Sequence, residues 1–145
     1  MIVKNVLKAK PSNAVATTSA DTSVTDAARH LHERRIGALV VVDPTDAIVG
    51  IISERDIARG LALHGDRLGG LRVADLMTSA VLVCSPDDSL ESLMGTMTTR
   101  RVRHLPVIDK GTLVGMITIG DVVKSRLEEA TMQVDQMRDY VMTAR

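Results

Sequence analysis

Two short stretches of this 145-residue sequence place a hydroxyl and a carboxylate at the same spacing. In "GIISERDI" Ser53 precedes Asp56 by three residues, and in "GMITIGDV" Thr118 precedes Asp121 by three. A carboxylate only accepts hydrogen bonds, which suits a diol, and a hydroxyl at a helix start adds to backbone amides that already favour anions. The same spacing also fits a helix cap with no ligand, and one helix start can serve both purposes.

Other kinds of site chemistry have no pattern in this sequence. It contains no nucleophile beside a base, no cluster with metal-ligand spacing and no Gly-x-x-x-x-Gly-Lys phosphate loop. Lys plus Arg equals Asp plus Glu at 18 each, and the only aromatic residue is one Tyr, so base stacking and binding of a polyanion are both disfavoured. We therefore expect no catalytic residues, no metal ion and no nucleic-acid partner.

The compartment is expected to be the cytoplasm. The start "MIVKNVLKAKP" has too short an apolar run for a signal peptide, and no window approaches 18 uninterrupted apolar residues, which argues against a membrane span. The single Cys84 cannot form an internal disulfide, and it lies on a predicted strand as packing.

The sequence repeats itself. A shift of 66 places Val15 on Val81 and Val41 on Val107, and a shift of 65 after the first turn places Gly50 on Gly115. Each copy shows a short strand, a helix with apolar residues at spacings of three and four, two β-branched strands and a second helix. The order β-α-β-β-α therefore occurs twice, each time after a short helical lead, "VKNVL" or "VADLM".

The predicted organisation follows from this duplication. We expect an α+β fold with a first repeat over 1–62, a Gly-rich linker over 63–72, a second repeat over 73–126 and a helical extension over 127–145. In the tail, apolar residues alternate spacings of four and three like an a/d seam, which fits docking onto the body or onto a second subunit. They are Val123, Leu127, Ala130, Val134, Met137 and Val141.

The duplicated unit resembles the cystathionine-β-synthase (CBS) domain, and a tandem pair of such domains is a Bateman module. The resemblance rests on "RRIGALVVVD" and "RRVRHLPVID", each followed by one of the two opening stretches, and covers nearly the whole chain. It implies two repeats packed sheet to sheet with pseudo-twofold symmetry. It also implies two clefts for adenine nucleotides such as AMP, ADP, ATP or NAD, each formed by the helix start of one repeat and strands of the other.

The resemblance assigns ligand-binding residues to both clefts. In each cleft the carboxylate would accept hydrogen bonds from the ribose hydroxyls, and the hydroxyl would donate to a phosphate. Apolar side chains would pack on the adenine. The first cleft would comprise Ile51, Ser53, Arg55 and Asp56 facing Val81, Leu82, Val102, Arg103 and His104. The second would comprise Met116, Thr118 and Asp121 facing Val15, Ala16, Ile36, Gly37 and Ala38.

The two predicted clefts differ in charge. Arg55, Arg103 and His104 of the first correspond to Gly120, Gly37 and Ala38 of the second. Because charge-assisted bonds to phosphate are about twice as strong as neutral ones, we expect tighter phosphate binding in the first cleft.

The expected function is that of a regulatory sensor of adenine nucleotides without catalytic activity. By the same resemblance it would form a homodimer, a disc of two CBS pairs, and act on a regulated protein that the sequence does not identify. The alternative is a structural or oligomerisation module with degenerate clefts.

Overall fold

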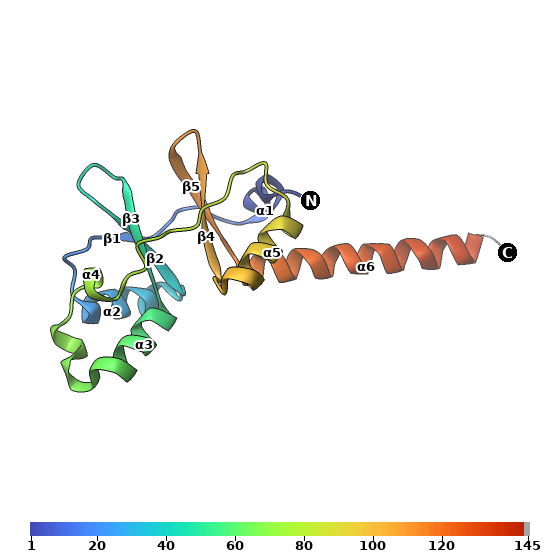
Figure 1. The fold of residues 1–145 in the computed structure, drawn as a ribbon. Coiled ribbons are helices and arrows are strands. Elements are labelled where there is room, and N and C mark those ends of the chain that lie inside the picture. Colours follow the sequence, from blue (N-terminus) through green and yellow to red (C-terminus); the bar gives the residue numbers. More distant parts are fainter. Residues whose placement is uncertain (144–145) are drawn as a thin grey trace. The chain divides into compact units, whose positions relative to one another are not determined.

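The computed structural model describes residues 1–143, which form two compact units (Figure 1). The first-repeat unit is Ala14–Leu82, and the second-repeat unit joins Met1–Asn13 to the chain from Val83 onward. The units therefore do not follow the repeat boundaries expected from the sequence, because the N-terminal lead belongs to the unit of the second repeat.

The first-repeat unit contains a three-stranded sheet in the order β1-β2-β3, with β1 parallel and β3 antiparallel to β2. The core lies between this sheet and its helices and includes Leu31, Leu39 and Ile52, all 4 % exposed or less. The elements are β1 Thr17–Thr18, α2 Val24–Arg34, β2 Ala38–Val42, β3 Ile48–Ser53, α3 Glu54–His64, the 3-10 helix η1 Gly65–Gly70 and α4 Val73–Leu76.

The second-repeat unit contains the hairpin β4-β5 and three helices. The stretch Asp-Lys-Gly-Thr at 109–112 has the residues of a hairpin turn and forms one between β4 and β5, with left-handed backbone at Lys110 and Gly111 (φ 50° and 80°). The elements are α1 Val3–Ala9, α5 Leu90–Arg100, β4 His104–Asp109, β5 Thr112–Thr118 and α6 Ile119–Thr143.

The first strand expected in each repeat is shorter than predicted. Over 14–18 only Thr17 and Thr18 are strand, and over 80–84 only Cys84 pairs, with Val107. In the first repeat the Val40 amide donates to the Ala16 carbonyl at 3.1 Å. The corresponding residue of the second repeat is Pro106, which has no N–H, so this bond of the parallel ladder cannot form there.

Serine side chains cap the first helix of each repeat. Ser23 Oγ accepts from the Asp26 amide at 3.1 Å, and Ser89 Oγ accepts from the Ser92 amide at 3.0 Å. The pattern of Asp88 with Glu91 three residues later favours Asp88 as the second cap, but the cap is Ser89, one residue further on. The Asp88 carboxylate instead accepts a bond from the Ser85 amide in the preceding turn, at 2.8 Å.

The two helical leads are exchanged between the repeats. The lead at the start of the chain, α1, packs on the second repeat, and the lead α4, which precedes the second repeat, packs on the first. The Val3 amide donates to the Asp88 carbonyl at 2.9 Å, and the Val73 amide donates to the Thr22 carbonyl at 2.8 Å. The expected linker over 63–72 is ordered, because it completes α3, forms η1 and leads into α4.

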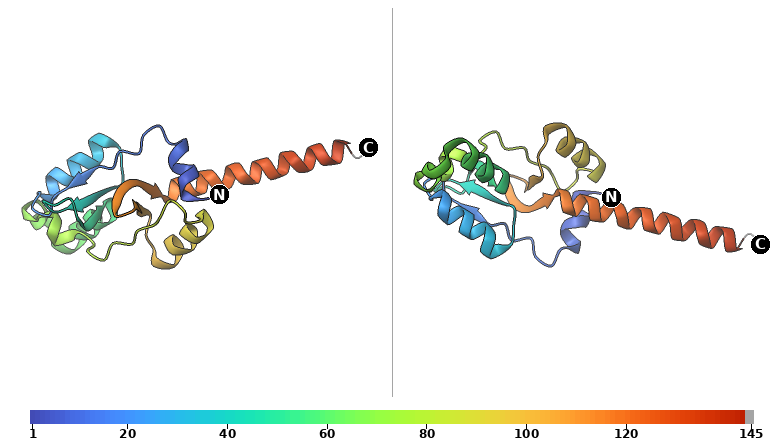
Figure 2. Two further views of the ribbon diagram at one scale, coloured as in Figure 1. Left: turned by 90° about the horizontal axis from the view of Figure 1, so that it is seen from above. Right: turned by 90° about the horizontal axis from the view of Figure 1, so that it is seen from below.

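Helix α6 is one continuous helix of 25 residues, so the expected boundary at residue 127 falls within it. Its first turns contact α5 and β5, and the views of Figure 2 show the remainder running away from the rest of the second-repeat unit. The seam residues predicted to dock are exposed on it, for example Val134 at 52 % and Met137 at 65 %. Among the described residues, the seam therefore has no cover from its own chain.

Candidate functional site

The Ser53 and Asp56 side chains form a reciprocal capping box where β3 passes into α3. Asp56 Oδ2 accepts from the Ser53 amide at 2.9 Å, and Ser53 Oγ accepts from the Asp56 amide at 3.3 Å. Asp56 is one of two buried polar residues among those described, at 6 % exposed. The box fixes the carboxylate at the positive end of a helix, where a negative charge is stabilised.

Gly37 and Ala38 lie beside this helix start. Ala38 pairs with Ser53 in the β2-β3 register, and the Glu54 amide donates to the Gly37 carbonyl at 3.0 Å. Half-buried Ile36 precedes them, and exposed Arg55 follows Ser53 in the first turn of α3. The structure thus brings together residues that the sequence had assigned to two different clefts.

Thr78, which no sequence pattern marks, contributes to the same helix start. Its hydroxyl lies 3.5 Å from Asp56 Oδ1, and its backbone forms a two-bond bridge with Ile51 (3.0 and 2.9 Å). Exposed Arg59 approaches the same carboxylate oxygen at 3.6 Å. Asp56 Oδ1 therefore has only long contacts, whereas Oδ2 is held by the shorter bonds of the box.

The second helix start repeats the box at Thr118 and Asp121. Asp121 Oδ2 accepts from the Thr118 amide at 3.0 Å, and Thr118 Oγ1 accepts from the Asp121 amide at 3.1 Å. The Lys10 ammonium, from the exchanged lead, donates to the same Oδ2 at 3.0 Å and to the Met116 carbonyl at 3.0 Å. No sequence pattern points to Lys10, because it lies 111 residues from Asp121.

Arg103 and His104 adjoin this second helix start within the same unit. His104 pairs with Thr118 in the β4-β5 register, and the Ile119 amide donates to the Arg103 carbonyl at 2.9 Å. The Arg103 side chain is exposed, and Val102 and His104 are half-buried. The Lys10 ammonium therefore contacts Asp121 and the Arg103 backbone adjoins the same helix start, whereas the cation that approaches Asp56 is Arg59 of its own helix.

The other predicted contact residues divide between the two units. Val15, Ala16, Val81 and Leu82 belong to the first-repeat unit, and all four are half-buried. Met116 lies on β5 in the second-repeat unit, opposite Pro106. The expected grouping of these residues into two clefts stays a prediction.

Two classes of site have no counterpart in the described part of the chain. Residues 1–143 contain no group of three or more His, Cys, Asp or Glu side chains placed to hold a metal ion. Burial and, to a smaller extent, the nearby Asp88 carboxylate together raise the pKa of the Cys84 thiol to about 12, so the thiol is protonated and a poor nucleophile at neutral pH. In the same residues, no helix is long and apolar enough to cross a membrane.

Comparison with known proteins accounts for the duplication. The family model described as "CBS domain" matches residues 3–63 and again residues 73–128. The chain belongs to the CBS domain family. Each match begins at a lead, so a CBS repeat as the family defines it includes the lead that the structure exchanges.

Similar proteins also contain CBS domains. The mitochondrial CBS domain-containing protein CBSX3 of Arabidopsis thaliana is 32 % identical over 146 residues, which span 96 % of this chain and 71 % of that protein. The crystal structure of a CBS-domain-containing protein from Agrobacterium tumefaciens is 40 % identical, with a TM-score of 0.84 over 87 % of this chain and 99 % of that one. The fold is that of a CBS domain pair.

One similar structure was solved with ligands. The CBS domain pair of protein MJ0100, in complex with 5'-methylthioadenosine and S-adenosyl-L-methionine, is 28 % identical to this chain. Its TM-score is 0.75, and the match covers 90 % of this chain and 98 % of that one. Both of its ligands contain adenosine.

Proposed function

We propose that this protein is a regulatory CBS pair that binds an adenosine-containing ligand, with AMP, ADP, ATP and NAD as the candidate nucleotides, and that it has no catalytic activity. The observation that carries the proposal is the pair of carboxylates, Asp56 and Asp121, each held at a helix start by the same box. The ligands of the similar MJ0100 pair support the adenosine class.

The geometry at Asp56 suits a ribose. A carboxylate has about four lone-pair sites, and the box uses those of Oδ2 while Oδ1 has contacts of 3.5 and 3.6 Å only. A ribose hydroxyl at Oδ1 would replace these long contacts without opening the box. The positive end of the α3 dipole would then favour a phosphate nearby.

A thermal-shift panel tests the proposal. The panel contains AMP, ADP, ATP, NAD, S-adenosylmethionine and 5'-methylthioadenosine, with guanosine and cytidine nucleotides as controls. A ligand at 100 times its Kd stabilises a protein by about 2.7 kcal/mol if it binds only the folded state. We expect at least one adenosine compound to raise the Tm and the other nucleotides to leave it unchanged, and a flat panel would contradict the proposal.

Variants assign the response to a helix start. Asp56→Asn and Asp121→Asn should each reduce the ligand-induced shift, because the amide is a weaker acceptor for a diol than the carboxylate. Ser89→Ala is the matched control, since it removes a cap from α5 at a cost of about 1 kcal/mol without touching either box. If Ser89→Ala reduced the ligand-induced Tm shift as much as the two Asp variants do, the reduction would be due to lower stability and not to lost ligand contacts.

A structural module with degenerate clefts is the second candidate. It is favoured by the boxes themselves, because each Asp already has protein partners and each cap is complete without a ligand. It predicts that Asp56→Asn and Asp121→Asn lower the Tm while no compound of the panel raises it in the native protein.

A further inference from the structure

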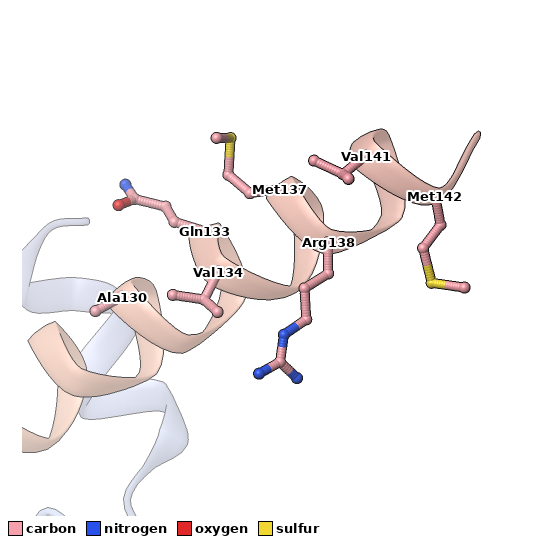
Figure 3. Close-up of a pocket in the computed structure, with 7 residues that line it drawn as sticks. All are labelled: Ala130, Gln133, Val134, Met137, Arg138, Val141 and Met142. Atoms are coloured by element: carbon pink, nitrogen blue, oxygen red, sulfur yellow. The ribbon is translucent and has the colours of Figure 1, made fainter. Parts of the chain in front are cut away.

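The exposed apolar seam of α6 has the spacing of a coiled coil. Its apolar residues alternate spacings of four and three. Leu127, Val134 and Val141 therefore occupy a positions of a heptad, and the remaining three seam residues occupy d positions. The seam residues are Val123, Leu127, Ala130, Val134, Met137 and Val141. Figure 3 shows the half of the seam from Ala130 to Val141, with these side chains projecting from α6.

The second-repeat unit packs against the opposite side of the same helix. Val122 is fully buried, and Ser125 donates a hydrogen bond to the Met1 sulfur at 2.7 Å. The N-terminal amine approaches Glu129 at 3.8 Å. Val122 and Glu129 occupy c positions and Ser125 an f position, so the body covers the face away from a and d. The seam therefore cannot turn onto its own body without the loss of these contacts.

The charges beside the seam favour a second copy in the parallel orientation. In a parallel pair, Arg126 lies opposite Thr131 of the second copy, and Gln133 opposite Arg138, so no like charges meet. An antiparallel pair matched on the same six residues would bring Lys124 next to Arg138 twice, which is repulsive. Val134 and Val141 are β-branched residues at a positions, a preference of parallel two-stranded coils.

We propose that α6 pairs with α6 of a second copy of this chain as a parallel two-stranded coiled coil along the seam. The proposal is independent of ligand binding. It also concerns a part of the chain beyond the CBS repeats, because the family match ends at residue 128 whereas α6 continues to Thr143. With fewer than three heptads the pair is short, so association should be reversible and depend on concentration.

The mass in solution tests the pairing. Sedimentation equilibrium over a concentration series from about 1 μM to about 1 mM, the range of weak interfaces, should show association of the full chain. The double variant Val134→Glu with Met137→Glu should have half the associated mass, because it places charges in adjacent layers of the seam. Met132→Glu is the matched control, an exposed residue of the same helix at an f position, and should associate like the native chain. A monomer throughout, or an unchanged mass in the double variant, would overturn the proposal.

Disulfide trapping tests the orientation. In a Cys84→Ala background, Met137→Cys places the new thiol opposite its own copy in a parallel pair and opposite Leu127 in an antiparallel one. Mild oxidation should therefore cross-link Met137→Cys to completion and leave Met132→Cys uncross-linked. Cross-linking only when Met137→Cys is combined with Leu127→Cys would overturn the parallel arrangement.

Discussion

Lys10 donates a hydrogen bond through its ammonium to the Asp121 carboxylate at 3.0 Å, and this bond ties the N-terminal lead to the helix start of the second repeat. The two side chains are 27 % and 21 % exposed. Lys10 also donates to the Met116 carbonyl, so the ammonium links the end of β5 and the start of α6 to the lead. The first-repeat unit has no such cation at the equivalent place, where the Thr78 hydroxyl faces Asp56.

Removal of the Lys10 ammonium should destabilise the protein. Lys10→Met keeps the aliphatic chain and removes two charge-assisted bonds, and we expect a loss of about 1 to 2 kcal/mol in the free energy of unfolding, measured by urea titration. Arg29→Met is the control, because its pair with Asp26 is more than 60 % exposed on both sides and should contribute almost nothing. Equal losses in the two variants would show that burial of the Lys10 pair has no effect.

The two glycines that receive the leads should tolerate a methyl group differently. A Cβ at Gly50 would lie 2.7 Å from Met77 Sδ and 3.1 Å from the Thr78 carbonyl oxygen, whereas a Cβ at Gly115 would lie 2.7 Å from the end of the Leu7 side chain. Because a backbone carbonyl cannot rotate away, Gly50→Ala should cost about 1 to 3 kcal/mol and Gly115→Ala less. Unfolding midpoints in urea measure both, and a larger loss in Gly115→Ala would contradict the packing argument.

Cys84 should make stability depend on alkaline pH. Its folded pKa is about 12 and its ordinary value 9.0, so the unfolded chain loses this proton first. The stability that the neutral thiol contributes is therefore fully present below pH 9 and declines as the pH rises toward 12. Cys84→Ala lacks this linkage, so the advantage of the native chain over the variant should narrow above pH 9 in unfolding titrations. An advantage that is constant across this range would contradict the assignment.

Phosphate recognition should depend on Arg103 more than on Gly37. We propose this from the chemistry of the residues, since a guanidinium forms charge-assisted bonds to phosphate and Gly37 has no side chain. Arg103→Ala should weaken AMP binding about tenfold and leave adenosine binding unchanged, measured by calorimetry. Gly37→Ala should change both ligands alike. Equal losses of AMP affinity in the two variants would remove the predicted difference between the clefts.

Much of the local structure was readable from the sequence because it depends on neighbours three or four residues apart. Ser53 with Asp56 and Thr118 with Asp121 predict helix starts, and both form capping boxes. The misplaced cap at Asp88 shows the limit of such patterns. Ser89 is an equally good cap residue, and the bond from the Ser85 amide to Asp88 decides between them.

The sequence by itself determined the duplication, the two helix starts and the spacing of the α6 seam, because each is written in residue types at fixed short intervals. Only the tertiary structure decided that the leads are exchanged, and hence that Lys10 meets Asp121 and Thr78 meets Asp56. The physical reason is that both repeats offer nearly the same surfaces, Gly50 or Gly115 among them, to either lead. Gly50 receives the lead that ends at Met77, and Gly115 receives the lead that contains Leu7. This choice depends on the path of the chain that connects leads and repeats, and no local sequence pattern specifies that path.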